Sequence, residues 1–351
     1  MSGRIKIGNR LIGSDSRPFI VAEISGNHNQ SLERAIKIVE AAADAGAHAV
    51  KLQTYTADTM TINIDKGSFL ISDSGSLWKG KTLYELYRQA YTPWEWHEPI
   101  FKRCSELGLI AFSTPFDESS VDFLESLSVP AYKIASFENN HLPLIRKVAE
   151  TGKPLMISTG MATLAELYET VNTAIELDCR DIILLKCTSA YPATPENANL
   201  LTIPHLKQLF NTEVGLSDHT LGVGVSIASV ALGASVIEKH FTLLRSDGGV
   251  DSAFSMEPWE MKILVHETYK AWQSLGKVSY EATENEQAST VYRRSIYIVK
   301  DIKRGEKFDT KNIRVIRPGD GIAPKYIDIL LGKRASRDIP KGIPMNWKFV
   351  E

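Results

Sequence analysis

Residues 213–241 read EVGLSDHTLGVGVSIASVALGASVIEKHF, and this stretch decides the fold. An apolar run ends in Ser217 and His219, a segment with helical periodicity follows, and a second apolar run ends in Glu238 and His240. A strand, a helix and a second strand in this order form a βαβ unit with parallel strands. The polar endings of both strands then lie at the same edge of the sheet.

Six more apolar runs with polar endings precede this unit. They are 19–23 (FIVAE), 48–54 (HAVKLQT), 108–115 (GLIAFSTP), 131–136 (AYKIAS), 154–160 (PLMISTG) and 181–187 (DIILLKC). Eight such strands separated by helices predict a (β/α)8 barrel, whose active site is built at the C-terminal ends of the strands. The endings bring lysines, hydroxyls, two histidines and two glutamates to one mouth. This inventory suits an anionic substrate together with a divalent metal ion.

Composition narrows the class of protein. A chain of 351 residues with 43% hydrophobic content can bury a barrel core and carry a small extra domain. A net charge of −2 argues against a nucleic-acid partner. The N-terminus has no apolar signal region and no run reaches membrane-spanning length, so we expect no membrane association. Three cysteines (Cys104, Cys179 and Cys187) without CxxC spacing fit a reducing cytoplasm and no structural zinc or disulfide framework.

The chain divides into three parts. We predict a barrel domain over residues 1–278, a polar linker over 279–293, and a small β-rich module over 294–351. The module contains a weak internal repeat, because DIKRG at 301–305 recurs as DIPKG at 338–342. The repeat predicts two similar strand–turn–strand units. So small a module has a thin core, and we expect it to dock on a barrel, either its own or a partner's.

Local signals place the helices. Ser31 is a predicted N-cap and Gly46 a stop for the first helix, and Thr163 with Glu166 forms a capping box after the fifth strand. The predicted apolar stripe of the first helix is Ala35, Ile36, Val39, Ala42 and Ala43. A further helix is predicted over 258–275.

The segment 57–83 is too long for an ordinary βα connection. It contains Phe69, Leu70 and Trp78 among glycines and serines. Long loops at a barrel mouth are usually lids or specificity elements, although a floppy insertion is the alternative.

Nine motifs in chain order resemble the sialic acid synthase family. They are AEISGNHNQ, KLQTYT, STPFD, YKIASFE, ISTGMAT, KCTSAYP, GLSDHT, IEKHFT and DSAFSMEP. The segments SIYIVKDIKRGE and IRVIRPGDGI are similar to the antifreeze-like (SAF) domain of that family. The resemblance implies condensation of phosphoenolpyruvate with an acetamido sugar, giving a nine-carbon 2-keto acid and phosphate. Residues 75–97 are most similar to the pseudaminic acid synthase branch, whose substrate is a 2,4-diacetamido-2,4,6-trideoxy-L-altrose.

Lysines and hydroxyls form the predicted phosphoenolpyruvate site. Lys51 and Lys133 end two different strands, and their ammonium groups suit a phosphate and a carboxylate on one small molecule. The alternative is that such lysines pair with nearby carboxylates. The hydroxyls expected to complete the site are those of Thr114, Ser136, Ser158, Ser189 and Ser217. Many relatives carry Asn where this chain has Ser189, and this difference also favours the pseudaminic branch.

His219 and His240 end neighbouring strands, which suits ligation of a first-row divalent cation. The resemblance implies that this ion is typically manganese, with cobalt or magnesium as alternatives. Such an ion polarises the aldehyde oxygen of the sugar. A structural role and a substrate contact are both open for His28, and the roles of Lys186 and Lys239 also stay open.

Glu23 is the first candidate for proton transfer and Glu238 the second. In the chemistry that the resemblance implies, C3 of phosphoenolpyruvate attacks the aldehyde carbon. Water then adds at C2, and phosphate leaves with C–O cleavage. The motifs place Gln53, Tyr191 and Asp251 against the open-chain sugar. The resemblance also implies a homodimer in which the SAF domains are swapped, so that Arg317 enters the partner's site.

Three alternatives stay open. An N-acetylneuraminate or legionaminic acid synthase performs the same chemistry on another acetamido sugar. A Schiff-base aldolase with Lys133 as nucleophile is a different enzyme class, and borohydride trapping distinguishes it. A non-catalytic sugar-binding protein is a third possibility, which phosphate release from phosphoenolpyruvate excludes.

Overall fold

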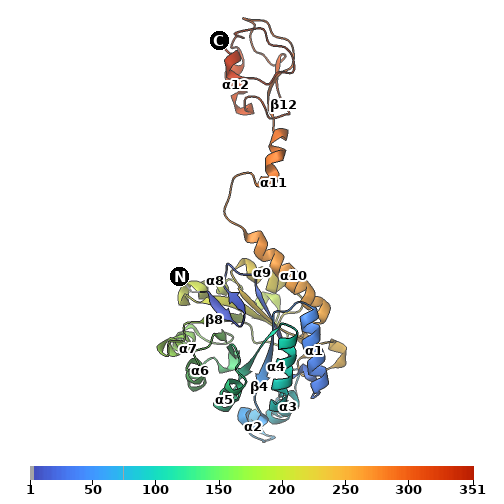
Figure 1. Cartoon of the computed structure of the whole chain (residues 1–351), viewed down its shortest axis with the longest axis vertical. Coiled ribbons are helices and arrows are strands. Elements are labelled where there is room, and N and C mark those ends of the chain that lie inside the picture. The colour runs from blue at the N-terminus through green and yellow to red at the C-terminus, as the bar shows by residue number, and fades with distance from the viewer. Residues whose placement is uncertain (1–3, 74) are drawn as a thin grey trace. The chain divides into compact units, whose positions relative to one another are not determined.

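The structure is a computed structural model that describes residues 4–73 and 75–351. Eight parallel strands close into a barrel in the order β10-β3-β4-β5-β6-β7-β8-β9, with helices around it (Figure 1). The predicted (β/α)8 barrel is confirmed. The barrel strands are β3 (Phe19–Glu23), β4 (Ala49–Thr54), β5 (Ile110–Pro115), β6 (Tyr132–Ile134), β7 (Leu155–Ser158), β8 (Ile182–Cys187), β9 (Glu213–Asp218) and β10 (Val236–His240).

A helix follows each barrel strand. The eight outer helices are α1 (Leu32–Asp44), α4 (His97–Glu106), α5 (Glu118–Ser126), α6 (Leu142–Ala149), α7 (Leu164–Glu176), α8 (Thr202–Phe210), α9 (Gly224–Ala231) and α10 (Pro258–Leu275). The last of these confirms the helix predicted over 258–275. Within residues 4–73 and 75–351, no helix combines the length and the apolar character needed to cross a membrane.

The predicted helix signals hold, with one correction. Ser31 caps α1 by accepting a hydrogen bond from the Arg34 amide, and Gly46 has a left-handed φ of +85° just beyond its end. Thr163 and Glu166 form the predicted capping box of α7. The predicted apolar stripe of α1 needs correction, because Ile38 is fully buried whereas the predicted members Ile36 and Ala43 are only partly buried.

A β-hairpin that the sequence pattern did not reveal closes the N-terminal end of the barrel. β1 (Ile5–Ile7) and β2 (Arg10–Ile12) pair antiparallel. Ile5, Ile7 and Ile12 share one hydrophobic cluster with barrel side chains such as Phe112 and Met156. Removing this apolar surface from water stabilises that end, and the opposite end is left to carry the site.

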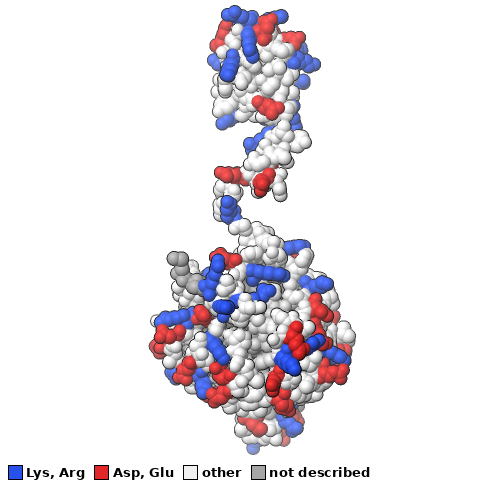
Figure 2. All heavy atoms as spheres, viewed as in Figure 1, with Lys and Arg blue, Asp and Glu red and all other residues white. Residues whose placement is uncertain are grey.

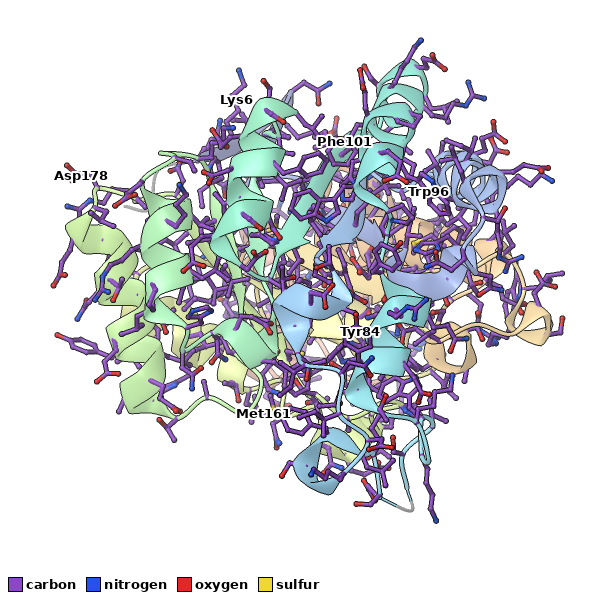
Figure 3. All side chains as sticks on the ribbon, turned by 90° about the horizontal axis from the view of Figure 1, so that it is seen from below. Lys6, Tyr84, Trp96, Phe101, Met161 and Asp178 are labelled. Atoms are coloured by element: carbon purple, nitrogen blue, oxygen red, sulfur yellow. The ribbon has the colours of Figure 1, made fainter. Side chains whose placement is uncertain are left out.

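The long segment after β4 contains two short helices. They are α2 (Ala57–Met60) and α3 (Leu83–Ala90), with a 3-10 turn η2 (Gly67–Phe69) between them. Figure 3 views the barrel from the side of α2 and α3, with Tyr84 of α3 and Met161 of the loop after β7 labelled. Further 3-10 turns are η1 (Ser25–His28), η3 (Trp94–Trp96), η4 (Ser136–Glu138), η5 (Pro195–Asn197), η6 (Arg245–Asp247) and η7 (Ser252–Phe254).

The chain separates into two compact units, and the second unit is Lys277–Glu351. Its strands β11 (Ser295–Ile298) and β12 (Ile313–Ile316) pair antiparallel. Its remaining elements are α11 (Glu284–Gln287), η8 (Ala288–Tyr292), η9 (Pro324–Tyr326), α12 (Ile327–Leu330) and η10 (Trp347–Phe349). The second unit therefore contains a small antiparallel sheet, as the sequence predicted.

The two copies of the internal repeat pair with each other inside this unit. Ile302 and Ile339 exchange backbone N–H···O hydrogen bonds of 2.9 and 2.8 Å. The carboxylate of Asp338 accepts a hydrogen bond from the Arg304 amide at 2.8 Å, and Asp301 makes the equivalent bond in the other copy. The same position plays the same role in both copies, which confirms the predicted repeat.

Candidate active site

A cavity of about 410 Å³ lies at the C-terminal ends of the barrel strands. This volume is typical of a small-molecule site. The predicted site residues that line it are Lys51, Gln53, Lys133, Ser136, Ser158, Tyr191, Ser217, His219, Glu238, His240 and Asp251. Glu23 and Thr114 lie behind this lining, where both contact Lys51.

Four charged side chains form a buried cluster at the base of the cavity. Lys51 Nζ lies 2.5 Å from Glu23 Oε2 and 3.7 Å from Glu238 Oε1. Lys133 Nζ lies 3.9 Å from the same oxygen of Glu238. The lysines are therefore paired with carboxylates, as the alternative interpretation expected. The two lysines and the two glutamates balance each other in charge. The contacts of Glu238 with the lysines, at 3.7 and 3.9 Å, are long enough for a bound anion to compete with them.

The two glutamates of this cluster differ in acidity. Burial raises the pKa of Glu23 and the neighbouring Glu238 adds to this, although Lys51 opposes it. Burial also acts against the ionised form of Glu238, but the charges of Lys133 and Lys51 outweigh it and lower the pKa. The pKa of Glu238 is thus the lower of the two, and Glu23 takes up a proton more readily as the pH falls.

Hydroxyl groups support both lysines. Thr114 Oγ1 accepts a hydrogen bond from Lys51 at 3.0 Å, and Ser158 Oγ accepts one from Lys133 at 2.7 Å. These bonds fix the ammonium groups at the cavity wall. Hydrogen bonds that involve an ionised group are stronger than neutral ones.

Gly160 makes room for two further hydroxyls. A Cβ atom at this position would clash with the hydroxyls of Ser136 and Ser189. Ser136 lines the cavity and Ser189 does not. Ser217, also predicted, donates to Glu238 Oε1 at 3.4 Å. Of the predicted hydroxyls, those of Thr114 and Ser158 contact the lysines, that of Ser217 contacts Glu238, and those of Ser136 and Ser189 lie beside Gly160.

A third carboxyl, Glu138, lines the cavity and was not singled out from the sequence. Its Oε2 atom is buried and has no hydrogen-bond partner among the residues that the structure describes. Burial raises the pKa of Glu138 to about 7, although the charge of Lys133 opposes this. A carboxyl with this pKa can both accept and donate a proton near neutrality. The available signal was its place in YKIASFE, two residues after Ser136.

The two histidines stand side by side, with ring centroids 5.3 Å apart. His219 Nδ1 lies 3.0 Å from the carbonyl oxygen of Thr188, which assigns the proton to Nδ1 and leaves Nε2 as a lone-pair donor. Burial lowers the pKa of His240 well below its usual range, so this imidazole is neutral. Burial acts to lower the pKa of His219 as well, but the contacts with Cys187 and the Thr188 carbonyl outweigh it and raise the pKa. His240 is therefore neutral and ready to bind a metal ion, whereas a metal ion at Nε2 of His219 would displace a proton.

This pair fits a divalent metal ion. His240 Nδ1 is buried without a hydrogen-bond partner in the described ranges, and Asp251 Oδ2 is 3.9 Å away. No three His, Cys, Asp or Glu side chains of residues 4–73 and 75–351 group closely enough to form a larger ligand set. Two imidazoles leave open positions for water or a substrate oxygen, which is typical of a catalytic rather than a structural metal site.

Two of the predicted sugar-binding residues, Gln53 and Asp251, belong to one hydrogen-bond network. Gln53 Nε2 donates to Glu23 Oε1 at 3.0 Å and to Ser25 Oγ at 3.1 Å. Ser25 Oγ in turn donates to Asp251 Oδ2. The amide of Gln53 and the carboxylate of Asp251 are therefore linked through a hydroxyl that the sequence analysis did not name.

Aromatic rings border the same region. The Tyr191 ring lies 4.5 Å from the His219 ring, 5.3 Å from Phe254 and 6.0 Å from Trp78, centroid to centroid. Trp78 Nε1 donates to the Val250 carbonyl at 2.9 Å. This bond joins the long segment after β4 to the segment after β10 at the barrel mouth.

The long segment contributes an apolar wall, but not with all the predicted residues. Trp78 lines the cavity, whereas Phe69 and Leu70 are not part of its lining. Apolar side chains of the same segment and of α3 take their place, namely Met60, Ile71, Leu83 and Leu86. The interpretation of this segment as a specificity element therefore agrees with its position.

Three residues whose roles were open are structural. Lys239 Nζ points away from the cavity and pairs with Asp218 at 3.1 Å. The His28 side chain is fully buried beside Thr92 and does not line the cavity. Lys186 binds the carbonyl of its neighbour Cys187 at 2.8 Å.

Arg317 belongs to the second unit. It is exposed in the loop that follows β12. Its side chain is therefore available to another surface.

The sequence matches the NeuB family over residues 38–280 and the SAF domain over residues 293–351. A protein named pseudaminic acid synthase, from Campylobacter jejuni, is 46% identical over 338 residues, which cover 96% of this chain and 97% of that protein. An N,N'-diacetyllegionaminic acid synthase from Legionella pneumophila is 37% identical over 345 residues, covering 97% of this chain and 96% of that protein.

A solved structure agrees with these relatives. The N-acetylneuraminic acid synthetase of Leptospira borgpetersenii, crystallised with citrate, has a TM-score of 0.74 and 31% identity. The match covers 84% of this chain and 97% of that one. Because the family match spans more than half of the chain and the relatives match over nearly their whole length, this chain belongs to the NeuB family and carries a C-terminal SAF domain.

Proposed function

We propose that this protein is a pseudaminic acid synthase. It condenses phosphoenolpyruvate with 2,4-diacetamido-2,4,6-trideoxy-L-altrose and releases pseudaminic acid and phosphate. The observation that carries the proposal is one cavity that combines paired lysines and hydroxyls, two adjacent imidazoles, and an apolar wall beside Trp78. The higher identity to a pseudaminic acid synthase, 46%, than to a legionaminic acid synthase, 37%, supports this branch.

Phosphoenolpyruvate binds on the lysine side of the cavity. Lys51 and Lys133 contact its phosphate and carboxylate, and the hydroxyls of Ser136, Ser158 and Ser217 complete the site, with those of Thr114 and Ser189 behind the cavity lining. Burial lowers the pKa of Lys133, so an arriving anion favours its charged form. The longer contacts to Glu238 are the ones that the anion replaces.

The sugar binds in its open-chain form beside Gln53, Tyr191 and Asp251. His219 and His240 hold a divalent ion, with manganese as the expected metal and cobalt or magnesium as substitutes. When bound, this ion polarises the aldehyde oxygen and makes the aldehyde carbon a better electrophile. The apolar wall accommodates the C6 methyl group.

The chemistry needs protons to move at the aldehyde and at C2. C3 of phosphoenolpyruvate bonds to the aldehyde carbon, and the aldehyde oxygen gains a proton. Water then adds at C2 and loses one proton. The C2 hydroxyl formed in this way passes its remaining proton to the phosphate as the C2–O bond breaks and phosphate leaves. We assign the protonation of the aldehyde oxygen to Glu23, which contacts Gln53 and Lys51. We assign the removal of the proton from water to Glu138. The charge of Lys133, on the phosphoenolpyruvate side of the cavity, acts on the pKa of Glu138. Glu238 stays ionised and holds both lysines.

We further propose a homodimer in which each SAF domain serves the partner's site through Arg317. Opposite charges support this arrangement. Residues 277–351 carry 16 Lys and Arg against 10 Asp and Glu, whereas residues 1–276 carry 24 against 32. Lys and Arg side chains gather on the face of the second unit that Figure 2 shows. A basic domain is attracted to an acidic barrel.

Exposed apolar side chains at the mouth offer such a domain a contact surface. Phe137, Met161, Leu201 and Leu221 follow β6, β7, β8 and β9 and are each more than half exposed. Large apolar side chains grouped at one rim mark interaction surfaces. The SAF domain of a second copy would cover them.

The runner-up is an N-acetylneuraminate or legionaminic acid synthase, with the same residues and another sugar. For the cellular location we propose the cytoplasm, because three free cysteines are typical of a reducing compartment. The function is tested by incubating the protein with phosphoenolpyruvate, manganese and the altrose derivative. Phosphate and a nine-carbon 2-keto acid should form in equal amounts. A stable adduct after borohydride treatment with a keto acid would instead support an aldolase.

A further inference from the structure

Ser25 follows β3 and Ile24 with a backbone φ of +50°. This left-handed conformation suits glycine and is unfavourable for a residue that has a Cβ atom. Such strain persists only where the surrounding structure holds it, and it is concentrated at functional sites. Ser25 is 3% exposed and lines the cavity.

The turn around Ser25 is fixed on both sides. Gly26 packs closely against α3, because a Cβ atom there would lie 3.1 Å from the Cα atom of Ala90. Asn27 Nδ2 donates to the Phe241 carbonyl at 3.0 Å and to Ser255 Oγ at 2.8 Å. The backbone at residue 25 therefore cannot relax without disturbing its neighbours.

A glycine would satisfy this backbone without strain, so the serine hydroxyl needs another explanation. Its Oγ atom donates to Asp251 Oδ2 and accepts from Gln53 Nε2 at 3.1 Å. Gln53 makes a second bond, to Glu23 Oε1 at 3.0 Å. One buried hydroxyl thus links the ends of three separate strand–loop segments across the cavity.

We propose that Ser25 is a positioning residue for the sugar, whose hydroxyl sets the orientation of the Asp251 carboxylate and the Gln53 amide. This inference rests on the proposed function, in which both groups contact the open-chain sugar. Without the hydroxyl, the carboxylate and the amide lose the group that holds them relative to each other. Binding of the sugar should weaken, and binding of phosphoenolpyruvate should not.

Two variants separate this role from a structural one. Ser25→Ala removes the hydroxyl and keeps the backbone strain, whereas Ser25→Gly removes both. Ser128→Gly is the matched control, because Ser128 also has a left-handed φ, +55°, and is exposed just beyond the end of α5. Thermal unfolding and initial rates are measured for the full-length protein with manganese, phosphoenolpyruvate and the altrose derivative.

We expect the KM for the sugar to rise about tenfold or more in both Ser25 variants, because a buried polar network is left open. The KM for phosphoenolpyruvate should change less than about twofold, and Ser25→Gly should melt above Ser25→Ala because it relieves the strain. Ser128→Gly should gain stability without any kinetic change.

An unchanged KM for the sugar in a folded Ser25→Gly protein would overturn the inference. So would equal increases in both KM values together with a lower melting temperature, since these indicate a purely structural role. Absence of turnover by the wild-type protein would contradict the proposed function itself, and this role with it.

Discussion

Lys51 lies directly opposite Glu23 in the register of β4 and β3, and 2.5 Å separates Nζ from Oε2. Both side chains are at most 4% exposed, and Glu238 adds a second carboxylate at 3.7 Å from the same ammonium group. Removing one partner of a buried pair leaves an uncompensated charge and costs about 3–5 kcal/mol. The proposed anion site is therefore also a point on which the stability of the barrel depends.

Lys51→Met should both destabilise the protein and weaken phosphoenolpyruvate binding. We expect a loss of about 3–5 kcal/mol in the free energy of unfolding and a rise of about tenfold or more in the KM for phosphoenolpyruvate. The double variant Lys51→Met/Glu23→Gln should recover most of the stability and none of the binding. Denaturant unfolding and saturation kinetics measure the two effects.

Lys133→Ala should raise the KM for phosphoenolpyruvate by a similar factor, about tenfold or more. Normal phosphoenolpyruvate saturation in both lysine variants would refute the anion site.

Removal of the metal should abolish activity. After extensive chelation we expect no phosphate release, and manganese, cobalt or magnesium should restore it to different extents. Replacing His219 or His240 by Ala should remove the tightly bound ion while the melting temperature of the metal-free protein stays close to that of the wild type. Metal analysis of purified variants checks this, and full activity of a metal-free preparation would be incompatible with it.

Glu138→Gln should separate stability from activity. The pKa of about 7 in the folded protein lies above the usual value for Glu, so the folded state binds the proton more tightly than the unfolded state. The stability that this provides is complete below about pH 4.5 and is lost as the pH rises through about 7. Because Gln cannot ionise, the variant should be more stable than the wild type at pH 8, by on the order of 3 kcal/mol, and no more stable at pH 4.5.

The same variant should lose kcat by about 100-fold or more, as expected for removal of a general acid–base group. The limb of the wild-type pH profile near pH 7 should disappear with it. A normal kcat in Glu138→Gln would contradict this role, and Glu23 would then be the candidate for removing the proton from water.

The swapped dimer predicts complementation between two inactive proteins. Arg317→Ala subunits keep an intact barrel, and Glu23→Gln subunits keep an intact SAF domain. A heterodimer of the two should therefore contain one complete site if the SAF domain serves the partner. Rates are measured after the subunits are mixed and exchanged. Heterodimers that form and remain inactive would show that Arg317 does not act across the dimer.

The polar endings of the apolar runs predicted the mouth of the barrel well, because the carboxyl ends of parallel strands meet at one edge of the barrel, although Lys51 and Lys133 lie within β4 and β6 rather than at their last positions. Lys51 and Lys133 could be placed in this way, and so could His219 and His240. Their pairing could not, since the register that puts Glu23 opposite Lys51 is a property of the closed barrel.

The missed residues lie just beyond the strands. Glu138 belongs to a 3-10 turn, and its unpartnered buried oxygen depends on what surrounds it. Ser25 looks like an ordinary loop serine until its φ of +50° is known. In α1, Ile36 and Ile38 have the same chemistry, and only the rotation of the helix against the barrel determines which is fully buried.

The most direct measurement of the central claim is kcat/KM for three sugars with phosphoenolpyruvate and manganese. The altrose derivative carries a methyl and a second acetamido group where N-acetylmannosamine has hydroxyls. Burying the methyl beside Trp78 contributes about 1 kcal/mol, and an absent acetamido group leaves its partners unpaired at about 1–3 kcal/mol.

These contributions sum to about 2–4 kcal/mol, so we expect kcat/KM for the altrose derivative to exceed that for N-acetylmannosamine by about 30- to 1,000-fold, and Trp78→Ala to reduce this ratio. Comparable turnover of N-acetylmannosamine, or better turnover of the legionaminic acid precursor, would contradict the assignment to the pseudaminic branch.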